Sequence, residues 1–289
     1  MRYAFIDARK AEFPVLRLCK VLRVSQSGYH AWKIRSAGGR HSPRLKSDQS
    51  MLVHVRAAFR ASHETYGSPR LAHELKARGI AIGRRRTARL MRESGLCARK
   101  RRRFVRTTDS GHGLPFAPNL LAQDFSAAAA NQKWASDITY VWTRQGWLYL
   151  AVVIDLYARR VVGWSASQRI DAALALAALK KALTLRPPSA GLIHHSDRGS
   201  QYCAYAYQVE LSKHAIAVSM SGKGNAYDNA VAESFFKTLK TELVWRTSFQ
   251  TRHEAVNAIA QYIDGFYNPS RRHSALGYLS PVQFERLAG

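Results

Sequence analysis

The chain has 289 residues, of which 46% are hydrophobic and 10% aromatic, and this composition excludes a wholly disordered polypeptide. Its 45 Lys and Arg residues outnumber 19 Asp and Glu residues, and the formal net charge of +26 favours a polyanionic partner such as nucleic acid. The three cysteines form no close pair, and no apolar run reaches the ~18 residues of a membrane span, so a reducing cytoplasm is expected and disulfides, secretion and membrane insertion are not.

The N-terminal residues predict two short helices followed by a linker. Residues 15–22 have helical spacing, residues 24–27 suit a turn, and a second helix includes Tyr29 and Trp32. This pattern fits a helix-turn-helix or an ordinary helical hairpin equally well. The polar residues 35–48, with two glycines and Pro43, predict a linker, so the first unit is expected to span residues 1–48.

Residues 49–108 predict a basic helical domain that binds DNA. Ser68 is expected to cap a helix that ends at Gly79, and a second helix is expected at residues 84–94. Eleven of the 23 residues from 84 to 106 are basic, and Glu93 is the only acid among them. A solvated basic face is the simpler interpretation, but a phosphate-binding helix explains the imbalance better. The predicted phosphate contacts on this helix are Arg84, Arg85, Arg86 and Arg89.

Residues 109–130 predict a second linker, and a mixed α/β domain is expected at residues 131–246. Strands at residues 133–143, 147–154 and 160–165 are joined closely enough to form an antiparallel meander. A helix at 171–183, a strand at 192–195, a helix at 204–214, a strand at 215–219 and a helix at 228–243 follow. Residues 247–289 predict a helical, basic tail in which Arg271 and Arg272 are candidate phosphate contacts.

Three carboxylates in the α/β domain are placed where they can converge. Asp137 lies in the middle of an apolar strand, where a carboxylate is costly without a cationic partner. Asp197 directly follows a strand, and Glu233 lies on a helix after 35 intervening residues. Carboxylate oxygens suit Mg²⁺ or Mn²⁺, and two such ions about 4 Å apart can activate a nucleophile and stabilise the leaving oxygen of a phosphodiester.

Other polar residues near these carboxylates have simpler interpretations. Asp155 is expected to be a strand-end residue, Asp228 the N-cap of the Glu233 helix, and Lys237 an ion-pair partner of Glu233 one turn away. His194 and His195 have no further His or Cys at ligand spacing, so a zinc site is not favoured.

Five blocks of the sequence resemble the insertion sequence three family of transposases: WASDITYV, IDLYARRVVGW, HHSDRGSQY, GNAYDNAVAESFFKTLK and YNPSRRHSALGYLSP. The resemblance covers nearly the whole chain and implies a ribonuclease-H-like, integrase-type catalytic domain behind an all-helical, helix-turn-helix N-terminal region. It implies that Asp137, Asp197 and Glu233 hold divalent metal and that Lys240, seven positions beyond Glu233, contacts DNA near the active site.

The resemblance also implies the activity and the partners. We expect a DNA transposase that cleaves and joins strands, acting on the element ends and target DNA as a homo-oligomer in a bacterial, nucleoid-associated setting. An upstream reading frame is expected to supply a further helix-turn-helix and coiled coil, by fusion or as a subunit. A nuclease without joining activity and a DNA-binding regulator with a vestigial site are the alternatives, and the three intact carboxylates argue against the second.

Overall fold

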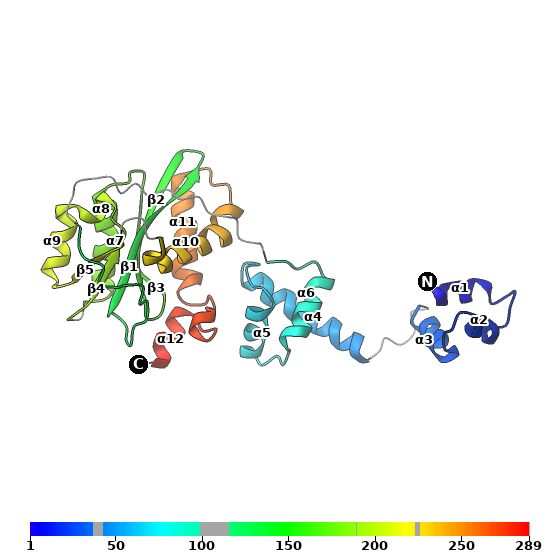
Figure 1. Cartoon of the computed structure of the whole chain (residues 1–289). Helices are drawn as coiled ribbons and strands as arrows, with labels where there is room; N and C mark the ends of the chain where they lie inside the picture. Colours follow the sequence, from blue (N-terminus) through cyan, green and yellow to red (C-terminus); the bar gives the residue numbers. More distant parts are fainter. Residues whose placement is uncertain (37–42, 99–115, 189, 223–225, 289) are drawn as a thin grey trace.

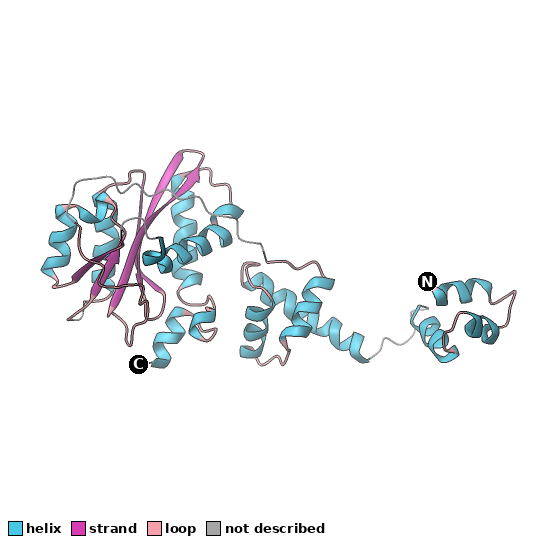
Figure 2. Ribbon diagram, viewed as in Figure 1, coloured by secondary structure: helices cyan, strands magenta, loops and turns pink. Residues whose placement is uncertain are grey.

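The computed structural model describes the chain except for residues 37–42, 99–115, 189, 223–225 and 289. Its N-terminal part contains helices alone, and its C-terminal part is a sheet flanked by helices (Figures 1 and 2). The basic cluster at residues 99–103 and the first part of the expected linker at residues 109–130 lie outside the described residues.

Helices α1 (Arg2–Arg9), α2 (Val15–Val21) and α3 (Gln26–Ser36) enclose a small core of their own. Ile6, Cys19 and Tyr29 are buried in it, and the Tyr29 hydroxyl donates a hydrogen bond of 2.7 Å to Asp7. The two helices expected here are confirmed. Helix α1 was not expected, because charges interrupt its short apolar pattern.

Helix α4 (Pro43–Ala61) corrects the expected linker at residues 35–48. Proline suits the first turn of a helix, where its missing N–H leaves no hydrogen bond unmade, and α4 begins at Pro43. The helix therefore passes through the expected boundary at residue 48. Its polar residue Asp48 is 7% exposed because it faces a neighbouring helix of the same unit.

Helices α5 (Ser68–Ala77) and α6 (Arg84–Glu93) complete this helical unit. Gly79 follows α5 with a φ of 78°, and Gly95 follows α6 with a φ of 66°. This left-handed conformation commonly ends a helix, and glycine adopts it without strain because it has no Cβ. Ser68 is the first helical residue and Gly67 precedes it as the cap, so the expected Ser68 cap is wrong. Buried residues from the three helices pack together: Val55, Phe59, Leu71, Leu75, Leu90 and Met91.

The sheet domain is built on five strands in the order β3-β2-β1-β4-β5. Strands β1 (Lys133–Thr143), β2 (Gly146–Asp155) and β3 (Arg160–Ser167) form the expected antiparallel meander. Helix α7 (Ala172–Leu185) then returns the chain so that β4 (Ile193–Ser196) pairs parallel to β1. Helices α8 (Ser200–Cys203) and α9 (Tyr205–Lys213) precede β5 (Ala217–Met220), which pairs parallel to β4.

The two faces of the sheet bury separate cores, because successive side chains of a strand point to opposite faces. Leu150 and Val152 of β2 belong to the core that includes helices α10 (Ala230–Glu242) and α11 (Arg252–Ala260). Ala151 and Val153 belong to the core that α7 covers. Helix α7 approaches the sheet so closely at Gly163 that an added Cβ would lie 2.7 Å from the Ala182 nitrogen.

The C-terminal tail packs onto the sheet domain and onto the helical unit. It contains a π-helical segment (Gln261–Tyr267), a 3-10 turn (Ser274–Leu276) and helix α12 (Pro281–Ala288). The Asn268 side chain hydrogen-bonds both the N–H and the C=O of Val161 on the edge strand β3. The core under α10 and α11 is continuous with that of helices α4 to α6.

Helix α12 also completes a network of charges at one end of the sheet. Glu285 pairs with Arg160 at 2.7 Å and with Arg186 at 2.5 Å, and Arg186 in turn pairs with the fully buried Asp155 at 3.2 Å. Asp155 also accepts hydrogen bonds from the backbone of Asn131 and Tyr157, so it is a structural residue at the end of β2.

No helix in the described part of the chain is both long enough and apolar enough to span a membrane. Residues 116–130 contain neither helix nor strand, but they are attached to the sheet domain. Leu121 is 2% exposed, and the Ser219 hydroxyl on β5 accepts hydrogen bonds from the N–H groups of Leu120 and Leu121. This part of the expected linker is therefore packed rather than free.

Candidate active site

Asp137 and Asp197 come together through the parallel pairing of β1 and β4. Ala135 pairs with His195 in that ladder. Asp137 lies two residues after Ala135 on β1, and Asp197 lies two residues after His195, directly beyond the end of β4. The Asp137 carboxylate accepts a 2.8 Å hydrogen bond from the N–H of Ile138. The two neighbouring strands thus bring Asp137 and Asp197 close to each other.

The turn after β4 fixes the second carboxylate. The Oδ1 atom of Asp197 accepts a 2.9 Å hydrogen bond from the N–H of Gly199. A Cβ added at Gly199 would lie only 3.0 Å from that oxygen, so a glycine permits the close approach. The sequence alone does not distinguish this glycine from an ordinary turn residue.

Glu233 reaches the site from the first turn of α10, where Val231, Ala232, Phe235 and Phe236 bury the adjoining face. The N-cap of α10 is Asn229, so the expected capping role of Asp228 is wrong. Asp228 instead accepts hydrogen bonds from Gly222, Asn119 and Gln123. The Asn229 side-chain amide donates a 3.1 Å hydrogen bond to the backbone carbonyl of Ser136. This bond links the start of α10 to β1 next to Asp137.

The electrostatics of Asp137 reflect the charges of the other two carboxylates. The pKa of Asp137 is raised well above its usual value, first by burial and then by the nearby charges of Asp197 and Glu233. Lys240 opposes this rise and lowers the pKa of Asp137. Mutually repelling carboxylates held around a partly buried position are unstable without a positive charge among them.

Glu233 is paired with Lys237 rather than gathered with the two aspartates. The Lys237 Nζ lies 3.6 Å from Glu233 Oε2, as the one-turn spacing predicts. Within the residues that the structure describes, no three His, Cys, Asp or Glu side chains stand ready as a metal-binding set. Glu233 thus contacts Lys237 while its charge still raises the pKa of Asp137.

Lys240 is almost fully buried, with 7% of its surface exposed. Its ammonium nitrogen lies 4.6 Å from the centre of the Tyr140 ring, and burial lowers its pKa while Asp137 raises it. It lines a cavity of about 700 Å³ beside the carboxylates, together with Tyr140, Trp142 and Trp147. No motif in the sequence predicted a role for these aromatic residues, although two closely spaced tryptophans around a predicted turn are a usable signal.

His194 and His195 are fully buried and serve the sheet domain. The Nε2 atom of His194 lies 2.8 Å from the Ser136 hydroxyl, and the Nδ1 atom of His195 lies 2.8 Å from that of Ser219. Burial, the largest cause in both rings, lowers the pKa of His194 to about 3 and that of His195 to about 4. Both rings are therefore neutral near pH 7 and hydrogen-bond neighbouring elements.

The candidate phosphate contacts divide into exposed and internally paired arginines. Arg84 and Arg85 are exposed on α6, whereas Arg86 and Arg89 each donate a 2.8 Å hydrogen bond to Asp48 of α4. Arg89 also pairs with Glu93 at 3.0 Å. Two of the four candidate arginines on α6 thus hold α6 against α4.

The two arginines of the tail have structural partners. Arg271 is 2% exposed and makes two hydrogen bonds, of 2.8 and 2.6 Å, to the carboxylate of Glu242. Arg272 pairs with Glu74 of α5 at 2.6 Å. The buried, bidentate ion pair of Arg271 leaves no guanidinium face for phosphate, so the expected phosphate contact at Arg271 is revised to a structural role. Arg272 is assigned first to its ion pair with Glu74 of α5.

A meander extended by two parallel strands, with carboxylates at its edge and on the following helix, defines an integrase-type catalytic core. Models of the integrase core domain match residues 127–226 and 214–281, and a model of an HTH-like domain matches residues 46–104. The chain is therefore an enzyme of the integrase class of polynucleotidyl transferases, with an HTH-like helical domain before the core.

Two relatives identify the family. The transposase InsF for insertion sequence IS3A of Escherichia coli K12 is 47% identical over 285 residues, which is 99% of this chain and 98% of InsF. The 31 kDa protein of insertion element IS600 from Shigella sonnei is 47% identical over 269 residues, which is 92% of this chain and 97% of that protein. The chain belongs to the insertion sequence three family of transposases.

Among solved structures, the chain is similar to a chain of the simian T-cell lymphotropic virus intasome in complex with the PP2A regulatory subunit B56 gamma. That match has a TM-score of 0.47 and 15% identity, and it covers 79% of this chain and 73% of the viral one. The catalytic core of HTLV-2 integrase in complex with magnesium matches 54% of this chain and 97% of its own, with a TM-score of 0.42 and 15% identity.

Proposed function

We propose that Asp137, Asp197 and Glu233 form the catalytic site at which this transposase cleaves DNA and joins the new end to a target strand. The observation that supports this assignment is the parallel register of β1 and β4, which leads to Asp137 and Asp197 side by side. The rise in the pKa of Asp137 under the influence of Glu233 brings the third carboxylate into the same group.

The donor set fits Mg²⁺ or Mn²⁺, and we propose two ions per site. All three groups are carboxylates, the oxygen ligands that these ions prefer, and they concentrate negative charge at a partly buried position. Asp137, Asp197 and Glu233 would hold the ions. Bound there, divalent metal supplies an activated water or 3′-hydroxyl and stabilises charge on the leaving oxygen.

The protein's own residues position these groups. Ile138 and Gly199 orient the two aspartates through their backbone N–H groups, and Asn229 anchors the start of α10 to β1. Lys240 adds a fixed positive charge next to Asp137, where a phosphate would sit. Donors that are already oriented need no reorganisation when charge develops on the reacting phosphate.

Outside the site, we propose that Arg84 and Arg85 contact the phosphates of the element ends and that Lys240 contacts the strand at the site. These two arginines are the exposed ones at the start of α6. Family membership supports an assembly of several copies on DNA in the bacterial nucleoid, with an upstream-frame subunit or fusion partner adding further DNA contacts.

The decisive test replaces one carboxylate at a time without a large change of shape. Asp137→Asn, Asp197→Asn and Glu233→Gln should each reduce cleavage and joining of labelled DNA ends by more than ~100-fold, because loss of a ligand costs more than loss of an outer group. Binding of the same ends, measured by fluorescence anisotropy in EDTA, should remain within about threefold of the parent, since the phosphate contacts of α6 are unchanged.

Asp264→Asn, the same chemical change at an exposed position of the tail, is the matched control and should keep both reactions. Near-parent cleavage by any one of the three variants removes that residue from the proposed site. A parent enzyme that hydrolyses ends without joining them would be a nuclease, and the strand-transfer product separates the two activities.

A further inference from the structure

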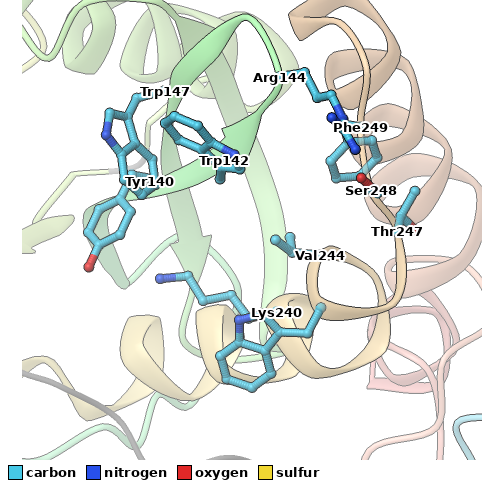
Figure 3. A pocket seen from close by; sticks show the side chains of 10 residues that line it. Tyr140, Trp142, Arg144, Trp147, Lys240, Val244, Thr247, Ser248 and Phe249 are labelled. Carbon is cyan, nitrogen blue, oxygen red and sulfur yellow. The ribbon is translucent and has the colours of Figure 1, made fainter.

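The cavity beside the carboxylates is lined by aromatic rings from two elements. Tyr140, Trp142 and Trp147 come from the β1–β2 hairpin, and Trp245 comes from the 3-10 turn Val244–Arg246 that follows α10. Figure 3 shows Tyr140, Trp142 and Trp147 along the strand side, with the Lys240 ammonium nitrogen pointing toward them. The cavity volume of about 700 Å³ lies within the ~300–1,000 Å³ typical of small-ligand sites.

The rings remain open to solvent, although they are among the most hydrophobic side chains. Trp142, Trp147 and Trp245 are 57%, 44% and 38% exposed. Trp142 and Trp147 face each other across the hairpin with ring centres 4.8 Å apart, and Tyr140 lies edge-on to Trp147 at 5.0 Å. A cluster of exposed aromatic rings around a hollow is typical of a binding site rather than of a folding core.

Positive charge accompanies the rings. Lys240 and Arg144 line the cavity, and no carboxylate is among its described lining residues. Arg252 adds a further cation next to the hairpin, where its Nε donates a 3.1 Å hydrogen bond to the carbonyl of Trp147. Aromatic faces combined with cations match the two parts of a nucleotide, the base and the phosphate.

The cavity lies on the strand that also provides a catalytic carboxylate. Tyr140 is three residues beyond Asp137 on β1, a rise of ~10 Å, or about three steps of a nucleic-acid strand at ~3.4 Å each. The odd spacing turns the two side chains to opposite faces of β1, and Lys240 of α10, the helix that also carries Glu233, contacts the Tyr140 ring. β1 and α10 therefore each provide one carboxylate of the proposed site, Asp137 and Glu233, and one residue of the cavity, Tyr140 and Lys240. A strand whose phosphate lies at the carboxylates would therefore place nearby bases at the cavity.

We propose that this cavity binds an unpaired nucleobase of the DNA strand within about three nucleotides of the reacting phosphate. The assignment rests on the function proposed above. A base inside a duplex is stacked and cannot enter a side cavity, so the end must fray or one base must flip out. The tryptophans compensate for the lost stacking, and Lys240 and Arg144 hold the phosphates on either side.

The experiment compares two DNA probes without metal. One is a duplex with three unpaired nucleotides at a 3′ end, one of them 2-aminopurine, and the other is the same duplex fully paired. In EDTA, the parent should bind the unpaired end at least about tenfold more tightly and quench the 2-aminopurine, because each stacked base adds that much affinity or more. Trp142→Ala combined with Trp147→Ala should abolish this preference and keep parent-like affinity for the paired duplex.

Three further variants make the result specific. Trp147→Phe keeps a stacking face and should retain most of the preference, whereas Trp245→Ala, on a different element, should reduce it. Tyr205→Ala removes an aromatic ring that is 85% exposed on α9, away from the cavity, and should change nothing. Melting temperatures identify any variant that fails to fold, and the single Trp142→Ala change, at the most exposed ring, then repeats the test.

The proposal is overturned if the parent shows no preference for the unpaired end, or if the double variant keeps it. It is also overturned if the tryptophans become protected from acrylamide as protein concentration rises without DNA, because a second copy of the chain then fills the cavity. Asp137→Asn should keep the preference in EDTA. A failure of the proposed catalytic residues and a failure of this base-binding cavity therefore give different results.

Discussion

Burial distinguishes Lys240 from a solvated surface lysine. Only 7% of it is exposed, its ammonium lies against the Tyr140 ring, and its nearest acidic influence is Asp137. A buried ammonium has lost most of its hydration, so a phosphate that arrives next to it interacts more strongly than it would in water. The simple alternative of an ordinary exposed lysine does not describe this residue.

Lys240→Ala should therefore reduce strand joining by at least about tenfold, because one charge-assisted contact to the reacting strand is lost. The free energy of unfolding should change by less than ~1 kcal/mol, since lost alkyl packing is offset by removal of a buried charge. Thermal melts and a strand-transfer assay on the same protein test both parts. Lys213→Ala, at an exposed lysine of α9, is the control, and unchanged joining in Lys240→Ala would assign Lys240 to packing alone.

His273 makes the tail sensitive to acid. Burial and then the charge of Arg271 lower its pKa to about 2, and its Nε2 lies 3.4 Å from an Arg271 nitrogen that can only donate. Between that value and the ~6.5 of an unfolded histidine, the unfolded chain binds a proton that the folded chain does not. The free energy of unfolding therefore falls as the pH is lowered from about 6.5.

His273→Gln should flatten this dependence, because the amide oxygen can accept the same hydrogen bond and has no proton to gain. Urea melts between pH 7 and pH 4 should show a slope smaller by up to ~1.4 kcal/mol per pH unit than that of the parent. His253→Gln, at an exposed position of α11, should keep the parent slope. An equal slope in His273→Gln would mean that the acid sensitivity arises at other buried groups.

Helix α6 has arginines that pair within the helical unit and arginines that remain exposed to solvent. Asp48 of α4 accepts hydrogen bonds from Arg86 and Arg89, and the Arg89 hydrogen bond is the largest cause that lowers its pKa. Arg84 and Arg85, at the start of the helix, remain exposed. One face of α6 thus stabilises the helical unit, and the other is available to a phosphate backbone.

Replacing these arginines in pairs should separate the two tasks. Arg84→Ala with Arg85→Ala should lower the slope of log affinity against log salt by about two and leave the melting temperature unchanged. Arg86→Ala with Arg89→Ala should lower the melting temperature, because Asp48 loses both partners. Equal salt slopes in the parent and the first pair would place the DNA contact on another surface.

Much of the element structure could be predicted from local pattern, and long-range charge pairing could not. The β-branched and aromatic residues of β1 predicted its bounds, 133–143, as the structure has them. The pairing of Arg86 with Asp48 spans 38 positions and that of Arg271 with Glu242 spans 29, so no helical or strand period reveals either. Sequence pattern therefore predicts phosphate contacts for Arg86 and Arg271, whereas in the folded chain both arginines pair with carboxylates of the protein itself.

The same limit applies within the candidate site. Strand and helix periods placed Asp137, Asp197 and Glu233 on the right elements, because each lies next to apolar residues that fix its position. Asp228 was misjudged because Asn229, one residue later, is the cap, and the partners of Asp228 come from residues 119, 123 and 222. The aromatic cavity depends on the hairpin meeting the turn after α10, which only the folded chain shows.

At the scale of the whole molecule, the C-terminal tail joins the helical unit to the sheet domain. Arg272 pairs with Glu74 of α5, and the Tyr66 hydroxyl accepts a 2.7 Å hydrogen bond from the N–H of Arg272. The adjacent Arg271 forms the buried ion pair with Glu242 at the end of α10. The Tyr262 hydroxyl also donates a 2.7 Å hydrogen bond to the Glu242 carboxylate. Neighbouring residues of one segment thus hold two domains.

Breaking this buried pair should destabilise the protein strongly. Arg271→Met or Glu242→Gln alone should cost ~3–5 kcal/mol, because each leaves a buried charge without its partner. The double variant Arg271→Met with Glu242→Gln should recover most of that loss, since it removes both charges together. Denaturant melts of the three proteins measure the coupling. Additive losses in the double variant would mean that the two residues act independently.

The network of Asp155, Arg186 and Glu285 has a consequence for how the protein is made. Domains generally fold as units during synthesis, from the N-terminus onward. The buried Asp155 shares Arg186 with Glu285 of α12, so its charge network spans residues 155 to 285. The sheet domain therefore reaches its full charge balance only after residue 285 has left the ribosome. Asp137, Asp197 and Glu233 are all synthesised before the residue that completes this network.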